Sequence, residues 1–228
     1  EGLNALANVL IQDKDDMVLT TRMEHHANDL PFRRVAKMVY VEVDVLGRIN
    51  IDDIEEELIK ANGKIKVVTI TGASNVTGYI TPIHDIARLA HKYGAVIIVD
   101  GAQLIAHREV NLAGNSKDEE IDFLTFSAHK AYAPFGSGAI VGKKDYLNEE
   151  DPFLSGGGCV AGVFDERLIW TAVPEKYEAG TQNFFGAIAM AKALSDLKNI
   201  GFQNIEMHEK LLKDYIINSM KSIKNVIM

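Results

Sequence analysis

The sequence contains only one cysteine and five prolines in 228 residues, and it has no excess of positive charge. Cys159 therefore has no partner within the chain for a disulfide, which favours a reducing compartment such as the cytoplasm. The formal net charge of −8 argues against a nucleic-acid surface, which needs a basic field to release counterions. No apolar run approaches the length of a membrane span, and the first residues do not resemble a signal peptide. We expect neither nucleic acid nor a membrane as a partner.

The composition, with 47% hydrophobic and 25% charged residues, is ordinary for a globular protein with a sizeable core. The chain opens at Glu1 within a helical pattern and stops at Met228, in or just after a long amphipathic segment. We therefore expect a fragment of a larger protein. Residues 1–200 would form most of a large domain, and residues 201–228 would begin a smaller one.

Short runs rich in β-branched residues alternate with helical patterns along the chain. The expected strands are 17–21, 38–43, 66–71, 95–99, 122–126 and 138–142. The runs at 66–71 and 95–99 are apolar at both parities, which is typical of strands covered on both faces. This alternation predicts an α/β fold, with a mainly parallel sheet flanked by helices and joined by right-handed crossovers.

Capping signals locate the expected helices between these strands. Asp52 with Glu55 is a plausible cap pair for one helix, and Thr81-Pro82 starts another. Two longer helices are expected at about 184–199 and 203–224. The stretch 143–181 is rich in glycine, proline and polar residues, so we expect a loop or an excursion from the sheet.

Three chemically useful residues follow expected strands. Asp100 comes directly after 95–99, Lys130 follows the strand that ends near Phe126, and Asn75 follows the strand that ends near Thr71. Ligands of open α/β sheets bind beyond the carboxyl ends of the strands, so these groups should converge on one edge.

A lysine and a carboxylate at one sheet edge suit pyridoxal phosphate. The lysine forms the covalent link, and the acid keeps the pyridine nitrogen protonated so that the ring can act as an electron sink. Gln103 lies three residues past Asp100, where it can reach the phenolic oxygen of the ring.

Five short motifs occur in order along the chain. They are Glu24-His25-His26-Ala27-Asn28, Ser74-Asn75-Val76-Thr77-Gly78, Asp100-Gly101-Ala102-Gln103, Ser127-Ala128-His129-Lys130 and Glu178-Ala179-Gly180-Thr181. The set resembles the class V aminotransferase-like family of pyridoxal-phosphate enzymes. Within that family it is most similar to SufS-type cysteine desulfurases, also called selenocysteine lyases. Each motif alone is weak, but their order and spacing cover nearly the whole chain.

The resemblance implies roles for individual residues at the ring. Lys130 would be the Schiff-base lysine and the acid and base at the substrate α-carbon. Asp100 would pair with the pyridinium nitrogen, and Gln103 with the phenolic oxygen. His25 would stack on the ring and shuttle protons, and Asn75 would lie beside the cofactor and the substrate carboxylate.

The resemblance also implies how the phosphate is held and which partners the protein has. Ser127 and His129 would hold the phosphate, while Thr181 would reach the phosphate of the neighbouring subunit in a homodimer with shared sites. The reaction would convert L-cysteine or selenocysteine to L-alanine, with sulfur passed to a cysteine outside this fragment. A sulfur-acceptor protein would follow, for iron–sulfur cluster assembly or selenium recycling.

The chain departs from the family pattern at several points. The Gly-Thr-Thr stretch that grips the phosphate should precede Glu1, and the catalytic cysteine and the substrate-carboxylate arginine belong to a later segment. Pro31-Phe32 stands where close relatives have Pro-Trp. We therefore expect the fragment itself to be inactive.

Other readings of the same residues are weaker. Adjacent His25 and His26 lack the spacing of two metal ligands on one helix face, so we expect no metal site. Cys159 has no neighbouring histidine or lysine to activate it, which indicates a loop cysteine. The string at 156–161 matches G-x-G-x-x-A but does not follow a clear strand. The remaining histidines have no supporting motif, and three of them are expected at the surface: His84, His91 and His208.

Two alternative functions stay open on the sequence. One is another class V reaction, such as transamination or a different β- or γ-elimination, because most substrate-selecting segments are missing. The other is a nucleotide-binding α/β module without catalysis. Titration with pyridoxal phosphate against nucleotide separates the second from the first.

Overall fold

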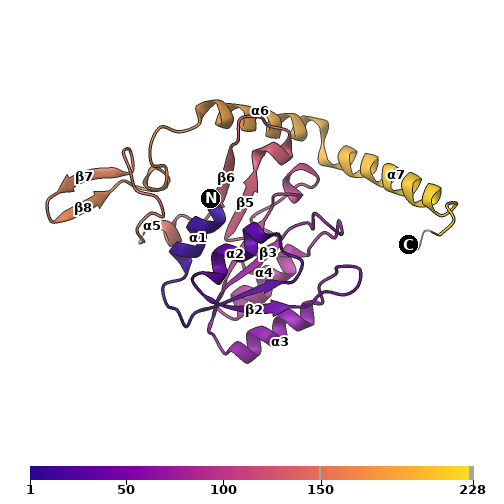
Figure 1. The fold of residues 1–228 in the computed structure, drawn as a ribbon, viewed down its shortest axis with the longest axis horizontal. Helices are drawn as coiled ribbons and strands as arrows, with labels where there is room; N and C mark the ends of the chain where they lie inside the picture. Colours follow the sequence, from indigo (N-terminus) through magenta and orange to yellow (C-terminus); the bar gives the residue numbers. More distant parts are fainter. Residues whose placement is uncertain (149, 226–228) are drawn as a thin grey trace.

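A six-stranded sheet forms the centre of the protein, whose residues 1–148 and 150–225 are described by a computed structural model (Figure 1). Five neighbouring strands run parallel, and the last edge strand runs antiparallel to its neighbour. In order across the sheet they are β2 (Lys37–Val41), β1 (Met17–Thr21), β3 (Ile65–Thr71), β4 (Val96–Asp100), β5 (Phe123–Ser127) and β6 (Gly138–Gly142). The predicted α/β fold with a mainly parallel sheet is confirmed.

The predicted strands agree with the observed ones to within one or two residues at each end. The run at 38–43 was predicted too long, because β2 ends at Val41. Val43 instead forms an isolated antiparallel bridge with Ile49, which closes the turn that leads into α3 (Ile51–Ala61).

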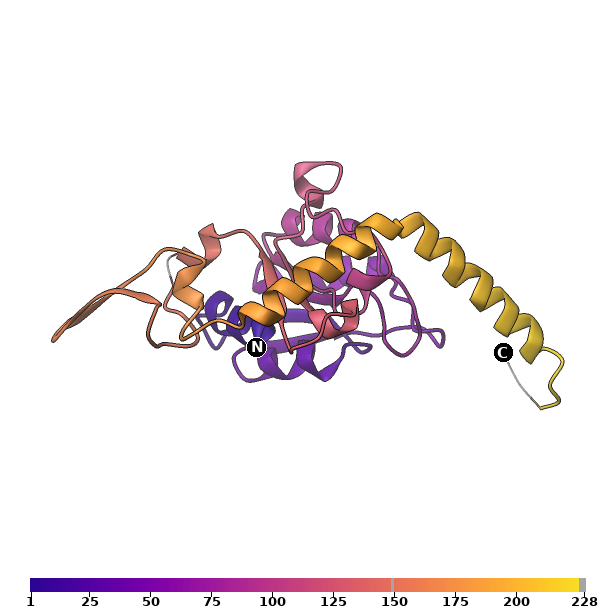
Figure 2. The same ribbon diagram turned by 90° about the horizontal axis from the view of Figure 1, so that it is seen from above.

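Helices cover both faces of the sheet (Figures 1 and 2). α1 (Gly2–Leu10) and α2 (His26–Arg33) pack on one face, and α3 and α4 (Ile83–Lys92) pack on the other. The chain passes from β1 to β2 in one direction across the sheet, and from β2 to β3 and β4 in the opposite direction. Since parallel crossovers are right-handed, this reversal puts α2 on the opposite face from α3 and α4.

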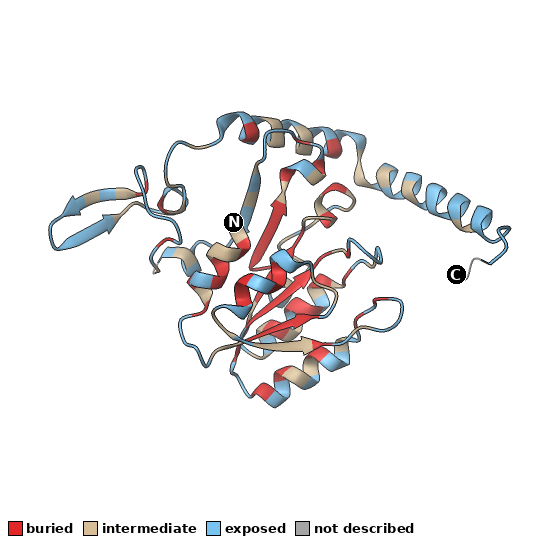
Figure 3. Cartoon of the chain, in the orientation of Figure 1, coloured by how far each residue is buried: buried red, intermediate tan, exposed pale blue. Residues whose placement is uncertain are grey.

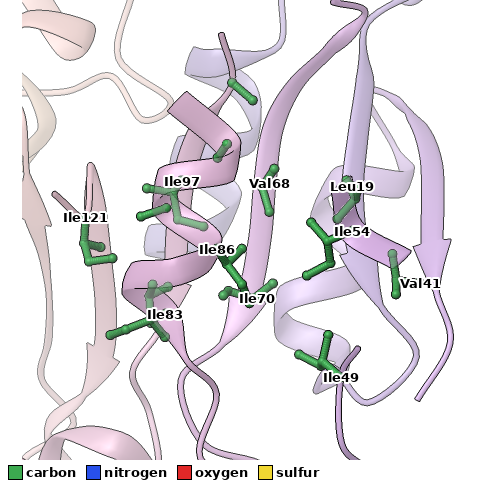
Figure 4. Close-up of a cluster of buried hydrophobic side chains, with 14 of the residues drawn as sticks. Leu19, Val41, Ile49, Ile54, Val68, Ile70, Ile83, Ile86, Ile97 and Ile121 are labelled. Carbon is green, nitrogen blue, oxygen red and sulfur yellow. The ribbon is translucent and has the colours of Figure 1, made fainter. Parts of the chain in front are cut away.

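Side chains of the central strands alternate between two hydrophobic layers. Val67 and Ile98 belong to the layer under α1 and α2, whereas Val68 and Ile97 belong to the layer under α3 and α4 (Figure 4). All four side chains are fully buried. The prediction that these strands are covered on both faces is therefore confirmed, because successive residues of a strand point to opposite sides.

Two helix starts differ from the sequence prediction. Asn50 caps α3, since its side chain accepts a hydrogen bond from the backbone nitrogen of Asp52 at 3.3 Å. The predicted cap pair of Asp52 with Glu55 is therefore wrong, because Asp52 already lies inside the helix. Pro82 stands one position before α4, as its cap and not as its first residue.

The segment 143–181 contains more structure than predicted. It holds the short helix α5 (Asp145–Asn148) and a two-stranded antiparallel hairpin of β7 (Val160–Phe164) and β8 (Arg167–Trp170). The hairpin extends away from the central sheet (Figure 1). Its signal was two short apolar runs separated by two polar residues, which the nearby glycines obscured. The prediction of an excursion from the sheet holds, but the prediction of a loop was wrong.

Two long helices follow the hairpin. α6 (Phe184–Ile200) and α7 (Phe202–Met220) are separated by Gly201, whose φ of 86° breaks the helical run. α6 crosses the sheet end and packs there through Leu197, whereas α7 extends outward with largely exposed side chains (Figures 2 and 3). Glu209 ties α7 to the body, accepting from Arg108 at 2.7 Å. Among the described helices, none is both long and apolar enough to cross a bilayer.

A buried carboxylate joins several elements at the amino end of the sheet. Asp122 accepts hydrogen bonds from the backbone nitrogen of Ile97 and from Nε2 of His91, both at 2.9 Å, and from Nζ of Lys143 at 2.7 Å. His91 was predicted to be a surface residue, and this prediction was wrong. His84 is also partly buried, with Nδ1 2.8 Å from a backbone carbonyl oxygen, whereas His208 is exposed as expected.

Asp122→Ala is expected to lower the free energy of unfolding by about 3 kcal/mol, because three donors lose a buried charged acceptor at once. Urea unfolding measures this loss. Glu120→Ala is the matched control, because it removes the other carboxylate that pairs with Lys143. Oε2 of Glu120 lies 2.9 Å from Nζ of Lys143, and the side chain of Glu120 is about one-third exposed. The control is expected to cost less than about 1 kcal/mol. Equal losses in the two variants would contradict the anchoring role of Asp122.

Candidate functional site

The carboxyl ends of β1, β3, β4 and β5 meet at one edge of the sheet, because these strands are parallel neighbours. The chain leaves β1 toward β2 and then returns to the other side of β1 as β3. Such a reversal of strand order opens a crevice in which ligands of α/β proteins bind. His25, Asn75 and Lys130 follow β1, β3 and β5, and Asp100 is the last residue of β4.

Asp100 is the last residue of β4 and is only 6% exposed. Its Oδ1 accepts a hydrogen bond from the backbone nitrogen of Ala102 at 2.9 Å. Within the described part of the chain, Oδ2 has no protein donor and stays available to a ligand. Gly101 allows the backbone after Asp100 to pack closely against β5, since a Cβ there would lie 2.6 Å from Cδ1 of Leu124.

Lys130 lies in the short 3-10 turn η3 (Ala128–Ala131), directly after β5. Residues three apart share a face in such a turn, and Ala128 and Ala131 are both fully buried. Lys130 is therefore on a different face from the buried pair, and it is partly exposed. Tyr132 then adopts a left-handed φ of 66°, which ends the turn.

The electrostatics of Asp100 indicate that Lys130 and His25 are its neighbours. Burial raises the pKa of Asp100, while the hydrogen bond from Ala102 and the nearby side chains of Lys130 and His25 lower it in opposition to burial. The structure therefore brings the predicted lysine and acid together at one edge, with the predicted histidine beside them.

His25 caps α2, and the geometry assigns its tautomer. Nδ1 accepts from the backbone nitrogen of Ala27 at 3.1 Å, so the neutral ring carries its proton on Nε2. The ring is exposed and its centroid lies 6.2 Å from that of His26. Each histidine thus has its own orientation, and in the described residues no group of three or more potential ligands is arranged to hold a metal ion.

Two other predicted residues, Gln103 and Asn75, lie in turns after these strands and differ in exposure. Gln103 is partly exposed and precedes the short turn η1 (Leu104–Ala106), one turn beyond Asp100. Asn75 is exposed in a tight turn that Ser74 organises, since Oγ of Ser74 accepts from the backbone nitrogens of residues 76 and 77.

The predicted phosphate-binding residues divide between two places. Ser127 ends β5 and is partly buried, and His129 follows in η3 and is exposed. Thr181 is exposed in the segment between η4 (Glu175–Tyr177) and α6, and it belongs to none of the four strand ends.

Glu24 joins the site although the sequence assigned it no role. Its Oε1 accepts from Oγ1 of Thr21 at 2.7 Å, and its Oε2 accepts from Nδ2 of Asn28 at 2.7 Å. The pKa of Glu24 is raised to about 7; burial is the largest cause, and the neighbouring Asp100 acts in the same direction. Its position beside His25 was the only sequence signal, because burial of the carboxyl is a tertiary property.

Comparison with known proteins agrees with this geometry. The aminotransferase class-V family model matches residues 1–228. A probable cysteine desulfurase of Halalkalibacterium halodurans is 35% identical over 92% of this chain and 52% of its own length. A cysteine desulfurase of Haloferax volcanii is 34% identical over 92% of this chain and 49% of its own.

Solved structures give the same answer. The cysteine desulfurase CsdA from Escherichia coli superposes with a TM-score of 0.88 at 28% identity, covering 97% of this chain and 56% of that one. The chain spans about half the length of the curated relatives that it resembles. Because the family match extends over every residue of the sequence, the chain belongs to the class-V aminotransferase family.

Proposed function

We propose that the protein carrying this chain is a pyridoxal-phosphate-dependent cysteine desulfurase that converts L-cysteine or selenocysteine to L-alanine. The observation that carries this proposal is the meeting of Asp100 and Lys130 at the carboxyl ends of the adjacent parallel strands β4 and β5. The names of the similar proteins, which are cysteine desulfurases, support the choice of reaction.

The groups at this edge fit the cofactor. Asp100 offers a buried carboxylate oxygen that has no donor among the described residues, which suits a protonated ring nitrogen. When bound, pyridoxal phosphate supplies an electron sink for charge that develops at the substrate α-carbon. Gln103 would donate to the phenolic oxygen, and His25 would stack on the ring.

The remaining residues would position the substrate and the phosphate. Lys130 would hold the ring covalently and accept the α-proton of the bound amino acid. Asn75 would lie beside the substrate carboxylate. Ser127 and His129 would bind the phosphate, and we propose a homodimer in which Thr181 reaches the phosphate of the neighbouring subunit.

The thiol that receives the sulfur would come from outside these residues. Cys159 is fully buried, and its Sγ donates to the carbonyl oxygen of Gly156 at 2.8 Å. A substrate sulfur has no access to such a thiol. We propose that the receiving cysteine passes sulfur to an acceptor protein in the reducing cytoplasm, and that residues 201–228 begin a smaller domain of the same protein.

Lys130→Ala is expected to abolish the visible absorbance of covalently bound pyridoxal phosphate, because it removes the amine beside Asp100. Absorbance spectra of the purified protein with added cofactor measure this. Lys14→Ala, an exposed lysine before β1, is the matched control and should keep the band. Survival of the band in the Lys130 variant would refute the assignment.

Asp100→Asn is expected to weaken cofactor binding by about 10- to 100-fold, because a neutral amide loses the charge-assisted bond to the ring nitrogen. Equilibrium titration of the cofactor-free protein gives the dissociation constant. An unchanged constant would show that Asp100 does not contact the ring nitrogen.

The reaction itself is tested by incubating the full-length protein with L-cysteine and a dithiol reductant, which releases the transferred sulfur as sulfide, and by quantifying alanine and sulfide. Alanine and sulfide are expected in equimolar amounts, whereas a keto acid product would indicate transamination. A Lys130→Ala version of the same protein provides the background rate.

A further inference from the structure

Glu24 links the end of β1 to the first turn of α2. Both of its carboxyl oxygens accept hydrogen bonds at 2.7 Å, one from the hydroxyl of Thr21 and one from the amide of Asn28. Thr21 is the last residue of β1, and Asn28 lies in α2 with its side chain fully buried. The hydrogen bonds of Glu24 therefore bridge the connection between β1 and α2 that contains His25.

The side-chain orientation of Asn28 is fixed by a hydrogen bond from β3. Its Oδ1 accepts from Oγ1 of Thr69 at 2.6 Å, and the carbonyl oxygen of Thr69 accepts from Oγ1 of Thr20 at 2.8 Å. Because the oxygen of the amide is already engaged by Thr69, the amide nitrogen must face Glu24. Buried polar groups that are satisfied in this way hold a single geometry. The carboxyl of Glu24 is thus held in place by β1, β3 and α2.

The charged groups around Glu24 belong to the candidate site. Asp100 lies opposite Thr71 in the register of β3 and β4, next to the strand that anchors Asn28. The charge of Asp100 acts on Glu24, and Lys130 from η3 and His25 from the cap of α2 act on Asp100. Burial is the main cause that raises the pKa of Glu24 to about 7; the hydrogen bonds from Thr21 and Asn28 oppose it. The charge on Glu24 consequently changes near neutral pH.

We propose that Glu24 is a positioning residue whose negative charge acts through Asp100 to hold a proton on the ring nitrogen of the cofactor. This inference rests on the proposed function, in which Asp100 pairs with that nitrogen. A second carboxylate beside Asp100 increases the affinity of the Asp100–ring pair for the proton that they share. As the pH rises, Glu24 ionises and adds this charge in the range where the proton would otherwise be lost.

The test follows the protonation of the ring nitrogen directly. The full-length protein is loaded with pyridoxal phosphate that carries ¹⁵N in the ring, and its ¹⁵N chemical shift is recorded from about pH 6 to about pH 9. In Glu24→Gln the nitrogen is expected to lose its proton about one pH unit lower than in the wild type, a tenfold change at fixed pH. Glutamine keeps the local bonds, because the hydroxyl of Thr21 can accept from its amide.

Two further variants separate charge from structure. Thr21→Val leaves Glu24 in place but removes a donor to its carboxylate, so Glu24 stays neutral to higher pH and the ring nitrogen shifts in the same direction as in Glu24→Gln. Glu42→Gln is the matched control, since the side chain of Glu42 is 76% exposed and pairs only with Arg22 among the described residues. Its ¹⁵N profile should coincide with that of the wild type.

A second readout uses the cofactor-free protein. The infrared difference spectrum between mildly acidic and mildly alkaline pH should contain a protonated-carboxyl band that Glu24→Gln removes and Glu42→Gln keeps. If the wild type binds no pyridoxal phosphate, the proposed function fails and the role of Glu24 fails with it. If the cofactor binds and the ¹⁵N profiles of the wild type, Glu24→Gln and Thr21→Val coincide, the role of Glu24 alone is overturned.

Discussion

The parallel pairing of β4 with β5 is the contact on which the candidate site depends. The register places Asp100 opposite Thr125, so β5 continues for two residues before η3 begins. This stagger brings the turn that carries Lys130 beside the end of β4. An antiparallel pairing of the same two strands would send the lysine and the carboxylate to opposite ends of the sheet. The right-handed crossovers that favour parallel pairing therefore also assemble the chemistry.

The two ends of the sheet use buried charge for different purposes. At the amino end Asp122 is satisfied by three donors and joins β4, α4 and the residue after β6. At the carboxyl end Asp100 has one backbone donor among the described residues, and its second oxygen has none there. An acid with both carboxylate oxygens engaged stabilises a fold, whereas a buried acid with an unengaged oxygen is available to a ligand. Satisfaction of hydrogen bonds thus distinguishes the structural carboxylate from the candidate functional one.

Exposed apolar side chains are concentrated outside the central sheet, on the hairpin, on α6 and on α7 (Figure 3). α6 buries Leu197 against Ala131 of η3, the residue next to Lys130, so its packing supports the turn that carries the lysine. The hydrophobic layers on the two faces of the sheet are well covered by comparison at the central strands β1, β3 and β4, whose residues are mostly buried. The central sheet is therefore the rigid platform from which the site residues extend.

Local sequence was sufficient for the strands, the α/β class and the convergence of Asp100 with Lys130, because period-2 patterns and strand-to-turn junctions are encoded by neighbouring residues. It was insufficient for the hairpin at 160–170, where the glycine-rich flank outweighed two short apolar runs. It also misplaced His91, whose burial depends on Asp122, a residue thirty-one positions away. The pKa of Glu24 depends in the same way on Asp100, which only the folded sheet brings near. The sequence alone thus determined which groups stand at the strand ends, and the tertiary structure decided which of them are buried, satisfied or left free, since burial and hydrogen bonding arise from contacts between distant residues.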